Sequence, residues 1–581
     1  MSKAVVSGKP FLLALYLRLL ARFGLSALVI MLARPAVGQQ ARAPGIDPQQ
    51  TEKQIDAVEI ERRRLLRPLP RTPTVAQPRL QSKAIALFQL NSVSVTGSVA
   101  IPSDAMEAVY APYIGRTVSQ TDMEIIASGI GDLYRDAGFH LSRAVIPPQD
   151  VKRGHLRIQV IEGSIAEIQL EGEGSEKYGV RETLSSLVEE HPSRLSSLER
   201  KLSVVNDIPG LRVVDTTLEE IGETTGHFRL TVRVQTWRVY TTLGLNNSGS
   251  HAVGPLQAYS STFFNSYLIR GDTLGINLST VPDATRDLRN GRLSYSLPIG
   301  NDGFRLGASG SYNEVWPADD RRQIDTRTIN QTYELRGSFS PIQTRQHTLT
   351  FTGSFGFTDE IQKDSTGTDY NDHIRVARVA ADYRIQDALN GSNYLTLGLR
   401  HGVNAFGATQ SDDPLGSRTG ASPNFSVFEF AYTRYQKLSN AFSIKASVSG
   451  QLASEPLFSS QAFYLGGAAF GPGYYSGDNG VAGLLEVRFD QAVQNRWIKG
   501  YQLYSFVDGG QVWNRNEEKQ SLASIGVGLR VNFVDEWYAS IAYAVPVSVS
   551  SKTEEYRSSR ILFSLSSSFK FCPDRAQMRC F

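Results

Sequence analysis

The sequence predicts an antiparallel β-barrel that crosses a membrane, preceded by two small α+β modules. Apolar and polar residues alternate with period two from Trp237 to the end of the chain. The alternating segments run to about ten residues, the length that a tilted strand needs to cross a bilayer. The 345 residues from 237 to 581 (581 − 237 + 1) give about sixteen strands at about twenty residues per strand and connection.

The N-terminus has the pattern of a secretory signal peptide over residues 1–38. Lys3, Lys9, Arg18 and Arg22 precede the apolar run FGLSALVIMLA, and small residues near Gly38 suit cleavage. The alternative is a single anchoring helix, but an apolar run of about ten residues is well short of the roughly twenty that span a bilayer.

Residues 39–80 are expected to hold a helix and a linker. A helix is favoured over 47–67, with Asp47 as its cap and Pro48 in its first turn. A run rich in proline follows up to Pro78, which is typical of an extended, semi-rigid linker.

Two tandem modules are predicted between this linker and Trp237. Residues 85–163 show the order strand, two helices, two strands, and residues 164–236 open with a strand and pass through two helical segments to two more strands. Because the order of elements repeats, two copies of one α+β module are expected. Segments 140–147 and 228–235 are candidate edge strands, although a purely structural role is the simpler interpretation of any residue in them.

The polar face of the later strands distinguishes a barrel from a β-sandwich. That face carries charged side chains, which a sandwich would have to bury and a water-filled barrel would not; they are Lys445, Glu486, Arg488, Asp490 and Arg530.

Composition argues against several classes of function. Lys plus Arg number 60 and Asp plus Glu 57, a formal charge of +3, so nucleic acid is not an expected partner. The sequence has no P-loop, no G-x-S-x-G and no H-E-x-x-H motif, and its 8 histidines lack metal-ligand spacing. We therefore expect neither an enzyme nor a cofactor.

Five segments follow one another along the chain: FQLNSVSVTG, YRDAGFHLSRAVIPPQDVKRGHLRIQVIEGSI, LERKLSVVNDIPGLRV, GLNNSGSHAVGP and GDTLGINL. In this order they resemble the two-partner secretion transporters (TpsB; ShlB/FhaC/HecB family) of the BamA-type superfamily, and the resemblance covers about 88–571. It implies that the two modules are periplasmic POTRA domains and that a barrel of sixteen strands lies in the outer membrane. It also implies that helix 47–67 can plug the pore, with arginines such as Arg62 near Glu486 and Asp490; a merely solvated helix is the alternative.

The glycine-rich stretch 464–480 resembles the loop that folds into the lumen in this superfamily. Its tip is expected at residues 471–474, and its partners on the barrel wall at Asp508 and Gly510. The usual arginine of the tip is replaced by Pro472 in this chain. Arg488 or Arg530 is therefore a candidate to neutralise Asp508, which could instead be simply hydrated. The four tip residues are Gly471, Pro472, Gly473 and Tyr474.

The C-terminal tail departs from the family pattern. Phe571 ends the last predicted strand, whereas the chain continues to Phe581, and either could be the signal for barrel assembly. Cys572 and Cys580 could form a disulfide in an oxidising compartment or remain as two thiols.

The resemblance implies an outer-membrane translocator that recognises an unfolded secreted protein, of adhesin or haemolysin type, through its POTRA domains and exports it without nucleotide hydrolysis. The alternatives are an assembly factor of the BamA or TamA type and a passive porin, which would have no use for two periplasmic modules. Other expected partners are outer-membrane lipid and, during biogenesis, the barrel-assembly machinery.

Overall fold

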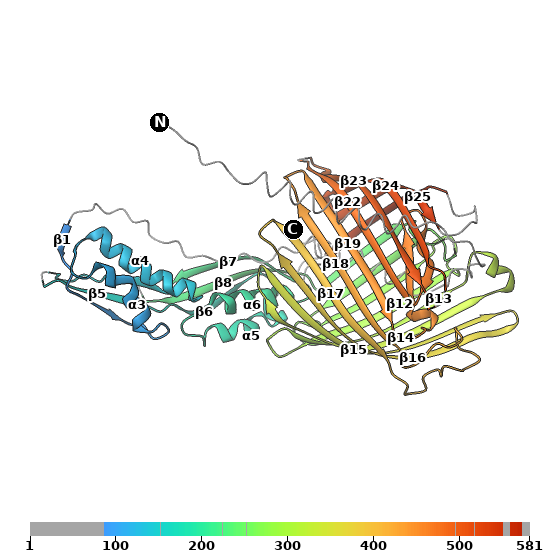
Figure 1. The fold of residues 1–581 in the computed structure, drawn as a ribbon, viewed down its shortest axis with the longest axis horizontal. Coiled ribbons are helices and arrows are strands. Elements are labelled where there is room, and N and C mark those ends of the chain that lie inside the picture. Colours follow the sequence, from blue (N-terminus) through green and yellow to red (C-terminus); the bar gives the residue numbers. More distant parts are fainter. Residues whose placement is uncertain are drawn as a thin grey trace.

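The computed structural model describes residues 86–571, with gaps at 152, 223–224, 251, 494, 516 and 550–557. The two modules and the barrel follow one another along the long axis of the molecule (Figure 1). The predictions for residues 1–80, for Cys572 and Cys580 and for Phe581 lie outside the described residues.

The first module packs two helices against a small sheet. Helix α4 begins at a capping box, in which the Ser119 side chain accepts from the N–H of Asp122 and the Asp122 carboxylate accepts from the N–H of Ser119. The helices bury Met106, Ile126 and Ile130 against the sheet. The elements are β1 (Ala86–Gln89), β2 (Ser92–Thr96), α3 (Ser103–Tyr110), β3 (Thr117–Ser119), α4 (Gln120–Asp136), β4 (Arg143–Val145) and β5 (His155–Ile161), with sheet orders β1-β3 and β2-β5-β4.

The second module repeats this plan around a sheet of order β6-β8-β7. The strand proposed as an edge at 228–235 belongs to β8, which pairs with β6 on one side and β7 on the other. That expectation was wrong, because both sides of its backbone are already hydrogen-bonded. The elements are β6 (Ser164–Glu171), α5 (Val180–Leu184), α6 (Leu195–Asn206), β7 (Leu211–Glu220) and β8 (His227–Thr236).

The modules meet through apolar and charged contacts. Leu141, from the first module, is buried in the core of the second. Arg143 on β4 donates to both carboxylate oxygens of Glu220 on β7, at 2.7 and 2.9 Å. The ends of two edge strands are therefore held together across the junction.

The barrel is closed by sixteen antiparallel strands, as the alternation predicted. Its first and last strands, β9 and β26, pair with each other. The strands are β9 (Val239–Asn246), β10 (Gln257–Asn265), β11 (Thr273–Thr280), β12 (Leu288–Ile299), β13 (Phe304–Val315), β14 (Arg327–Gln343), β15 (His347–Asp364), β16 (Gly367–Gln386), β17 (Gly391–Gly402), β18 (Ser426–Lys437), β19 (Phe442–Ala453), β22 (Asn479–Ala492), β23 (Ile498–Trp513), β24 (Gln520–Phe533), β25 (Trp537–Val549) and β26 (Arg560–Phe571).

The barrel presents an apolar outer face. Alternate side chains such as Leu335 and Val527 are exposed on the outside, whereas Glu486 and Arg488, which alternate with Val487, are buried inside the barrel. Among the described residues, no helix is both long enough and apolar enough to span a membrane.

Helix α6 fixes the second module to one end of the barrel. Lys201 donates to Asp302, in the turn between β12 and β13, at 2.7 Å, and Arg200 donates to the carbonyl oxygen of Ser340 at 3.0 Å. Arg270, in the turn between β10 and β11, forms an ion pair with Glu182 of α5. The turn ends of β10 to β14 thus face the modules, and their other ends lie at the far side of the barrel (Figure 1).

Candidate functional site

A hairpin occupies the inside of the barrel between β19 and β22. It consists of β20 (Phe463–Gly467) and β21 (Gly471–Gly477), which pair only with each other. Three residues, Ala468 to Phe470, form the turn, and the N–H of Phe470 donates to the carbonyl oxygen of Gly467 at 3.0 Å.

The turn lies ahead of the expected tip. Gly471 to Tyr474 belong to strand β21 rather than to the turn itself. Gly471 and Gly473 have φ values of +81° and +67°, so the strand starts in a backbone conformation that glycine tolerates and other residues rarely adopt. The tip expected from the position of the family's arginine therefore lies on the C-terminal side of the turn that the structure shows.

The hairpin packs on an apolar part of the inner wall. Leu465, Phe470 and Tyr475 are nearly fully buried, and they share one cluster with wall residues from β23, β24 and β25. Tyr474 lies over this group, with ring centroids 5.1 Å from Phe470 and 4.8 Å from Tyr475. The wall residues of the cluster are Phe506, Val512, Leu522, Ala542 and Ala544.

Two glycines allow the hairpin to approach the wall closely. A Cβ at Gly510 on β23 would lie 2.6 Å from Leu465 Cδ1, and a Cβ at Gly467 would lie 2.7 Å from Asp508 Oδ1. An alanine at either position would force the neighbouring atoms to move. Gly510 therefore lies under the hairpin, at the position proposed for it on the wall.

Asp508 holds the turn of the hairpin through the backbone. Its Oδ2 accepts from the N–H of Ala468 at 3.1 Å, and its Oδ1 accepts from the hydroxyl of Ser524 at 2.5 Å. A backbone donor thus occupies the carboxylate that binds the tip arginine in the superfamily pattern.

Arg488 and Arg530 do not contact Asp508. Arg488 Nε donates to Glu486 Oε2 at 2.7 Å, and Arg530 Nη2 donates to Glu486 Oε1 at 3.1 Å. The guanidinium of Arg530 also lies 3.7 Å from the ring centroid of Tyr504. The two arginines proposed to neutralise Asp508 pair with Glu486 instead. The sequence alone could not show which of these two carboxylates is their partner.

A basic side chain does lie near the expected tip, but it comes from the last strand. A Cβ at Gly471 would lie 2.7 Å from Arg560 Nη1, and Arg560 Nη2 donates to the carbonyl oxygens of Asn247 and Gly249 at 3.1 and 3.0 Å. The hairpin therefore extends along the wall, past β25, to the seam between β26 and β9. Pro472, between the two glycines, is half-buried.

The loop between β17 and β18, residues 403–425, covers the hairpin at the far end of the barrel. Arg418 forms an ion pair with the buried Asp478 at the end of the hairpin segment. The N–H of Ser459 donates to the hydroxyl of Ser417 at 3.0 Å, and Phe425 packs with Phe458. Sequence reasoning missed this loop, because its contacts join segments that no local pattern connects.

No group of three or more side chains able to hold a metal ion occurs in the described part of the chain. The arrangement is that of a barrel whose lumen holds a hairpin packed on one side of the wall, with an outer loop over the end of the hairpin.

The family described as haemolysin secretion/activation protein ShlB/FhaC/HecB matches residues 227–531, and the ShlB-type POTRA domain matches residues 88–163. The chain belongs to the ShlB/FhaC/HecB family. It is a two-partner secretion transporter, and this identification favours secretion over the assembly-factor alternative. The barrel lies in the outer membrane and the POTRA modules lie in the periplasm, so the far end of the barrel faces the cell exterior.

Individual relatives agree with this assignment. The transporter is 22% identical over 564 residues to the heme/hemopexin transporter protein HuxB of Haemophilus influenzae, covering 90% of this chain and 94% of HuxB. It is 25% identical over 256 residues to the outer membrane transporter CdiB of Escherichia coli, covering 43% of each chain. The solved structure of CdiB from E. coli has the same fold, with a TM-score of 0.71 at 18% identity over 90% of this chain and 98% of that one.

Proposed function

We propose that the transporter binds an exported partner protein in extended form along its POTRA sheets and passes it through the lumen of the barrel. The observation that supports this most directly is the alignment of open sheet edges across the POTRA junction. Strands β4 and β7 each pair with one neighbour in the described structure, and the ion pair between Arg143 and Glu220 joins their ends. A secreted protein of adhesin or haemolysin type fits this role.

An open edge can bind a chain of variable sequence, because backbone N–H and C=O groups make the contacts. Strand β7 is the longer of the two edges, with 10 residues, and its Val214 side chain is 57% exposed. We infer that β7 is the main edge for the partner and that β4, with 3 residues, extends it.

We infer that the luminal hairpin obstructs the route in the observed state. Its apolar contacts run along the inner wall from β22 to β26, with the fully buried part on β23, β24 and β25, and the turn is held by the backbone contact to Asp508. For export, the hairpin and the loop 403–425 must move together, because Arg418 and Asp478 join them.

The transporter family has no catalytic role that this site would serve, and we propose transport without enzymatic activity. The free energy would come from binding along the POTRA edges and from folding of the partner outside the cell.

The test is to replace the full chain by a variant that lacks residues 88–235 and to compare the secreted and outer-membrane proteins of the two strains. We expect one secreted protein to be lost from the medium and cell surface while the barrel still resists unfolding by heat. A fall in many outer-membrane proteins, with secretion unchanged, would instead indicate an assembly factor.

A further inference from the structure

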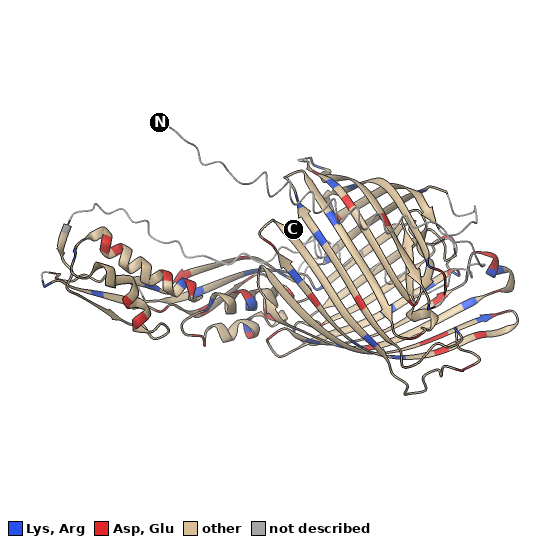
Figure 2. Ribbon diagram, viewed as in Figure 1, with Lys and Arg blue, Asp and Glu red and all other residues tan. Residues whose placement is uncertain are grey.

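A group of arginines lies on the outer face of the barrel, at its extracellular end. The guanidinium carbon of Arg286, in the β11–β12 loop, lies 3.8 Å from the ring centroid of Trp316, and that of Arg327 lies 5.3 Å from it. Arg289 is the cross-strand neighbour of Glu314, and Lys363 is that of Arg327. Charged residues are visible at this end of β14 and β15 in Figure 2.

These cations outnumber the carboxylates that pair with them. Glu314, with its side chain 4% exposed, accepts from Trp316 Nε1 at 2.9 Å and from Arg327 Nε at 2.7 Å, and Arg289 Nη1 lies 3.6 Å from its other oxygen. Arg286 pairs with Asp325 at 2.9 Å. Three guanidinium groups thus share two carboxylates.

The side chains of Arg286 and Arg289 remain accessible, each 57% exposed. A buried carboxylate beneath them orients Arg289 and Arg327, so the group is built into the wall rather than scattered on a flexible loop. Its excess charge is positive and faces away from the lumen.

The group lies at the height of the outer-leaflet headgroups. Glu314 is 10 residues (314 − 304) beyond Phe304, which begins β13 at the periplasmic end, and about 9–11 residues of a tilted strand cross the hydrocarbon layer. Below the arginines, the same outer face carries exposed Leu293, Tyr312 and Tyr333.

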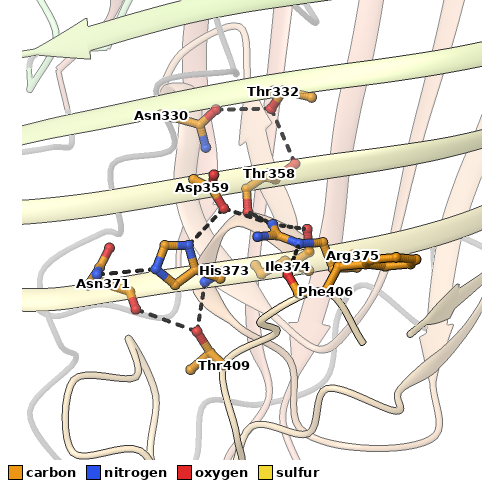
Figure 3. A network of polar contacts seen from close by, with 10 residues as sticks. All are labelled: Asn330, Thr332, Thr358, Asp359, Asn371, His373, Ile374, Arg375, Phe406 and Thr409. Atoms are coloured by element: carbon orange, nitrogen blue, oxygen red, sulfur yellow. Dashed lines mark hydrogen bonds and ion pairs between the residues drawn. The ribbon is translucent and has the colours of Figure 1, made fainter. Parts of the chain in front are cut away.

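The neighbouring strands show the same boundary. On β15 the outer face changes from aromatic to polar between Phe357 and Asp359. Asp359 accepts from Arg375 Nη1 at 2.7 Å and pairs with His373 at 2.8 Å (Figure 3). The guanidinium carbon of Arg375 lies 5.2 Å from the ring centroid of Phe357, whose ring contacts that of Phe406. In this network Asp359 forms an ion pair with Arg375. The three arginines around Trp316, in contrast, share two carboxylates.

We propose that Arg286, Arg289 and Arg327, around Trp316, bind phosphate groups of the lipopolysaccharide in the outer leaflet. Arginine suits this ligand because its planar guanidinium can donate two hydrogen bonds to one phosphate. Trp316 has the ring type enriched at membrane interfaces and would lie beside the sugar and acyl boundary. Lys363, on the next strand, extends the positive surface.

The test uses the full-length protein in detergent with EDTA present, so that divalent cations do not bridge lipid to carboxylates. Bound deep-rough lipopolysaccharide is counted by native mass spectrometry for the wild type and for Arg286→Gln/Arg289→Gln, which leaves the pair of Arg327 and Glu314 intact. The matched control is Arg336→Gln, which removes an arginine of the same strand β14 that pairs with Glu334 inside the barrel. Arg286→Lys/Arg289→Lys keeps the charge.

We expect roughly a tenfold or greater loss of affinity in the double glutamine variant, since each cation near a lipid surface contributes about 1 kcal/mol. The control should bind as the wild type does, and the lysine variant should keep most of the affinity. Dephosphorylated lipopolysaccharide should bind to the wild type about as weakly as intact lipopolysaccharide binds to the double glutamine variant. Equal binding of the wild type and the double glutamine variant would overturn the proposal. So would full competition by millimolar inorganic phosphate alone, which would indicate a site for free anions.

Discussion

The carboxylate of Asp508 on β23 accepts a hydrogen bond from the backbone N–H of Ala468 in the turn of the luminal hairpin, with 3.1 Å between the nitrogen and Oδ2. Because the donor is backbone, this contact places no demand on the side chains of the turn. A hairpin can therefore be held at this wall without the arginine that is usual in the superfamily.

Replacing Asp508 should weaken the closure of the channel by the hairpin only when the new side chain has no oxygen to accept the N–H of Ala468. Asp508→Ala leaves the N–H of Ala468 without its partner, at a cost of about 1–3 kcal/mol. Asp508→Asn keeps one acceptor oxygen and should behave nearly as the wild type does. Single-channel recording in planar bilayers should show longer openings for the alanine variant only; equal closure in both variants would contradict the role given to this contact.

Alanine at either close-approach glycine should push the hairpin from the wall. A Cβ at position 467 would lie 2.7 Å from Asp508 Oδ1 and 3.2 Å from Leu522. A Cβ at position 510 would lie 2.6 Å from Leu465 and 2.3 Å from the carbonyl oxygen of Val481 on the adjacent strand β22. Overpacking of this kind costs about 1–3 kcal/mol, so both Gly510→Ala and Gly467→Ala should increase conductance. Gly353→Ala is the control, because a Cβ there meets nothing within 4 Å; an increase in that variant as well would indicate a general weakening of the barrel.

Pro472→Arg should assemble normally, with or without Arg488. Arg488 and Arg530 contact Glu486 rather than Asp508, so no arginine has to be displaced from Asp508 to admit a new one. We expect the yield of heat-resistant barrel to be the same for Pro472→Arg as for the wild type, and the same for Pro472→Arg/Arg488→Ala as for Arg488→Ala alone, since Arg488→Ala by itself removes a buried partner of Glu486. Poor assembly of the single variant, relieved by Arg488→Ala, would show that Arg488 does act on Asp508.

The POTRA junction should lose stability in mild acid because of His140. Burial lowers the pKa of His140 from its usual 6.5 to about 4, and its ring nitrogens have no hydrogen-bond partner among the described residues. The unfolded chain then binds a proton between these two pH values and the folded chain does not, so stability falls as the pH drops from 6.5 towards 4.

Pulse proteolysis of the POTRA region in urea, on the full-length protein, measures this effect. We expect a loss of roughly 1–3 kcal/mol across that interval, and a flatter profile for His140→Leu. An unchanged slope in the variant would assign the acid sensitivity to other groups.

The architecture was predictable because barrel strands repeat one local rule. In segments such as 524–533 the apolar residues face lipid and the polar residues face the lumen, and alternation alone shows this. The two helices expected in residues 85–163 were likewise visible in the sequence, and α4 is one of them. The mistaken edge strand at 228–235 shows the limit, since pairing order in a sheet depends on partners distant in sequence.

The candidate site was predictable in its parts but not in its pairings. The glycine-rich segment, Asp508 and Gly510 were found by resemblance, and all lie at the hairpin. The partners of Arg488 and Arg530 depend on which of several inward carboxylates is nearest across the strands, which no sequence pattern specifies. The position of the turn was misplaced for a similar reason, because three ordinary residues, Ala468 to Phe470, form it.

The most direct test of the luminal route is to fix the hairpin to the wall and measure export. The N–H of Ala469 lies 3.5 Å from the hydroxyl of Ser524, so Ala469→Cys/Ser524→Cys, in a chain whose native cysteines are replaced by serine, should form a disulfide. The secreted partner is then quantified under oxidising conditions and after a reductant is added, with each single cysteine variant as control. We expect export to stop when the disulfide forms and to resume on reduction. Undiminished export by a fully cross-linked barrel would contradict the proposal that the partner passes through a lumen from which the hairpin must move.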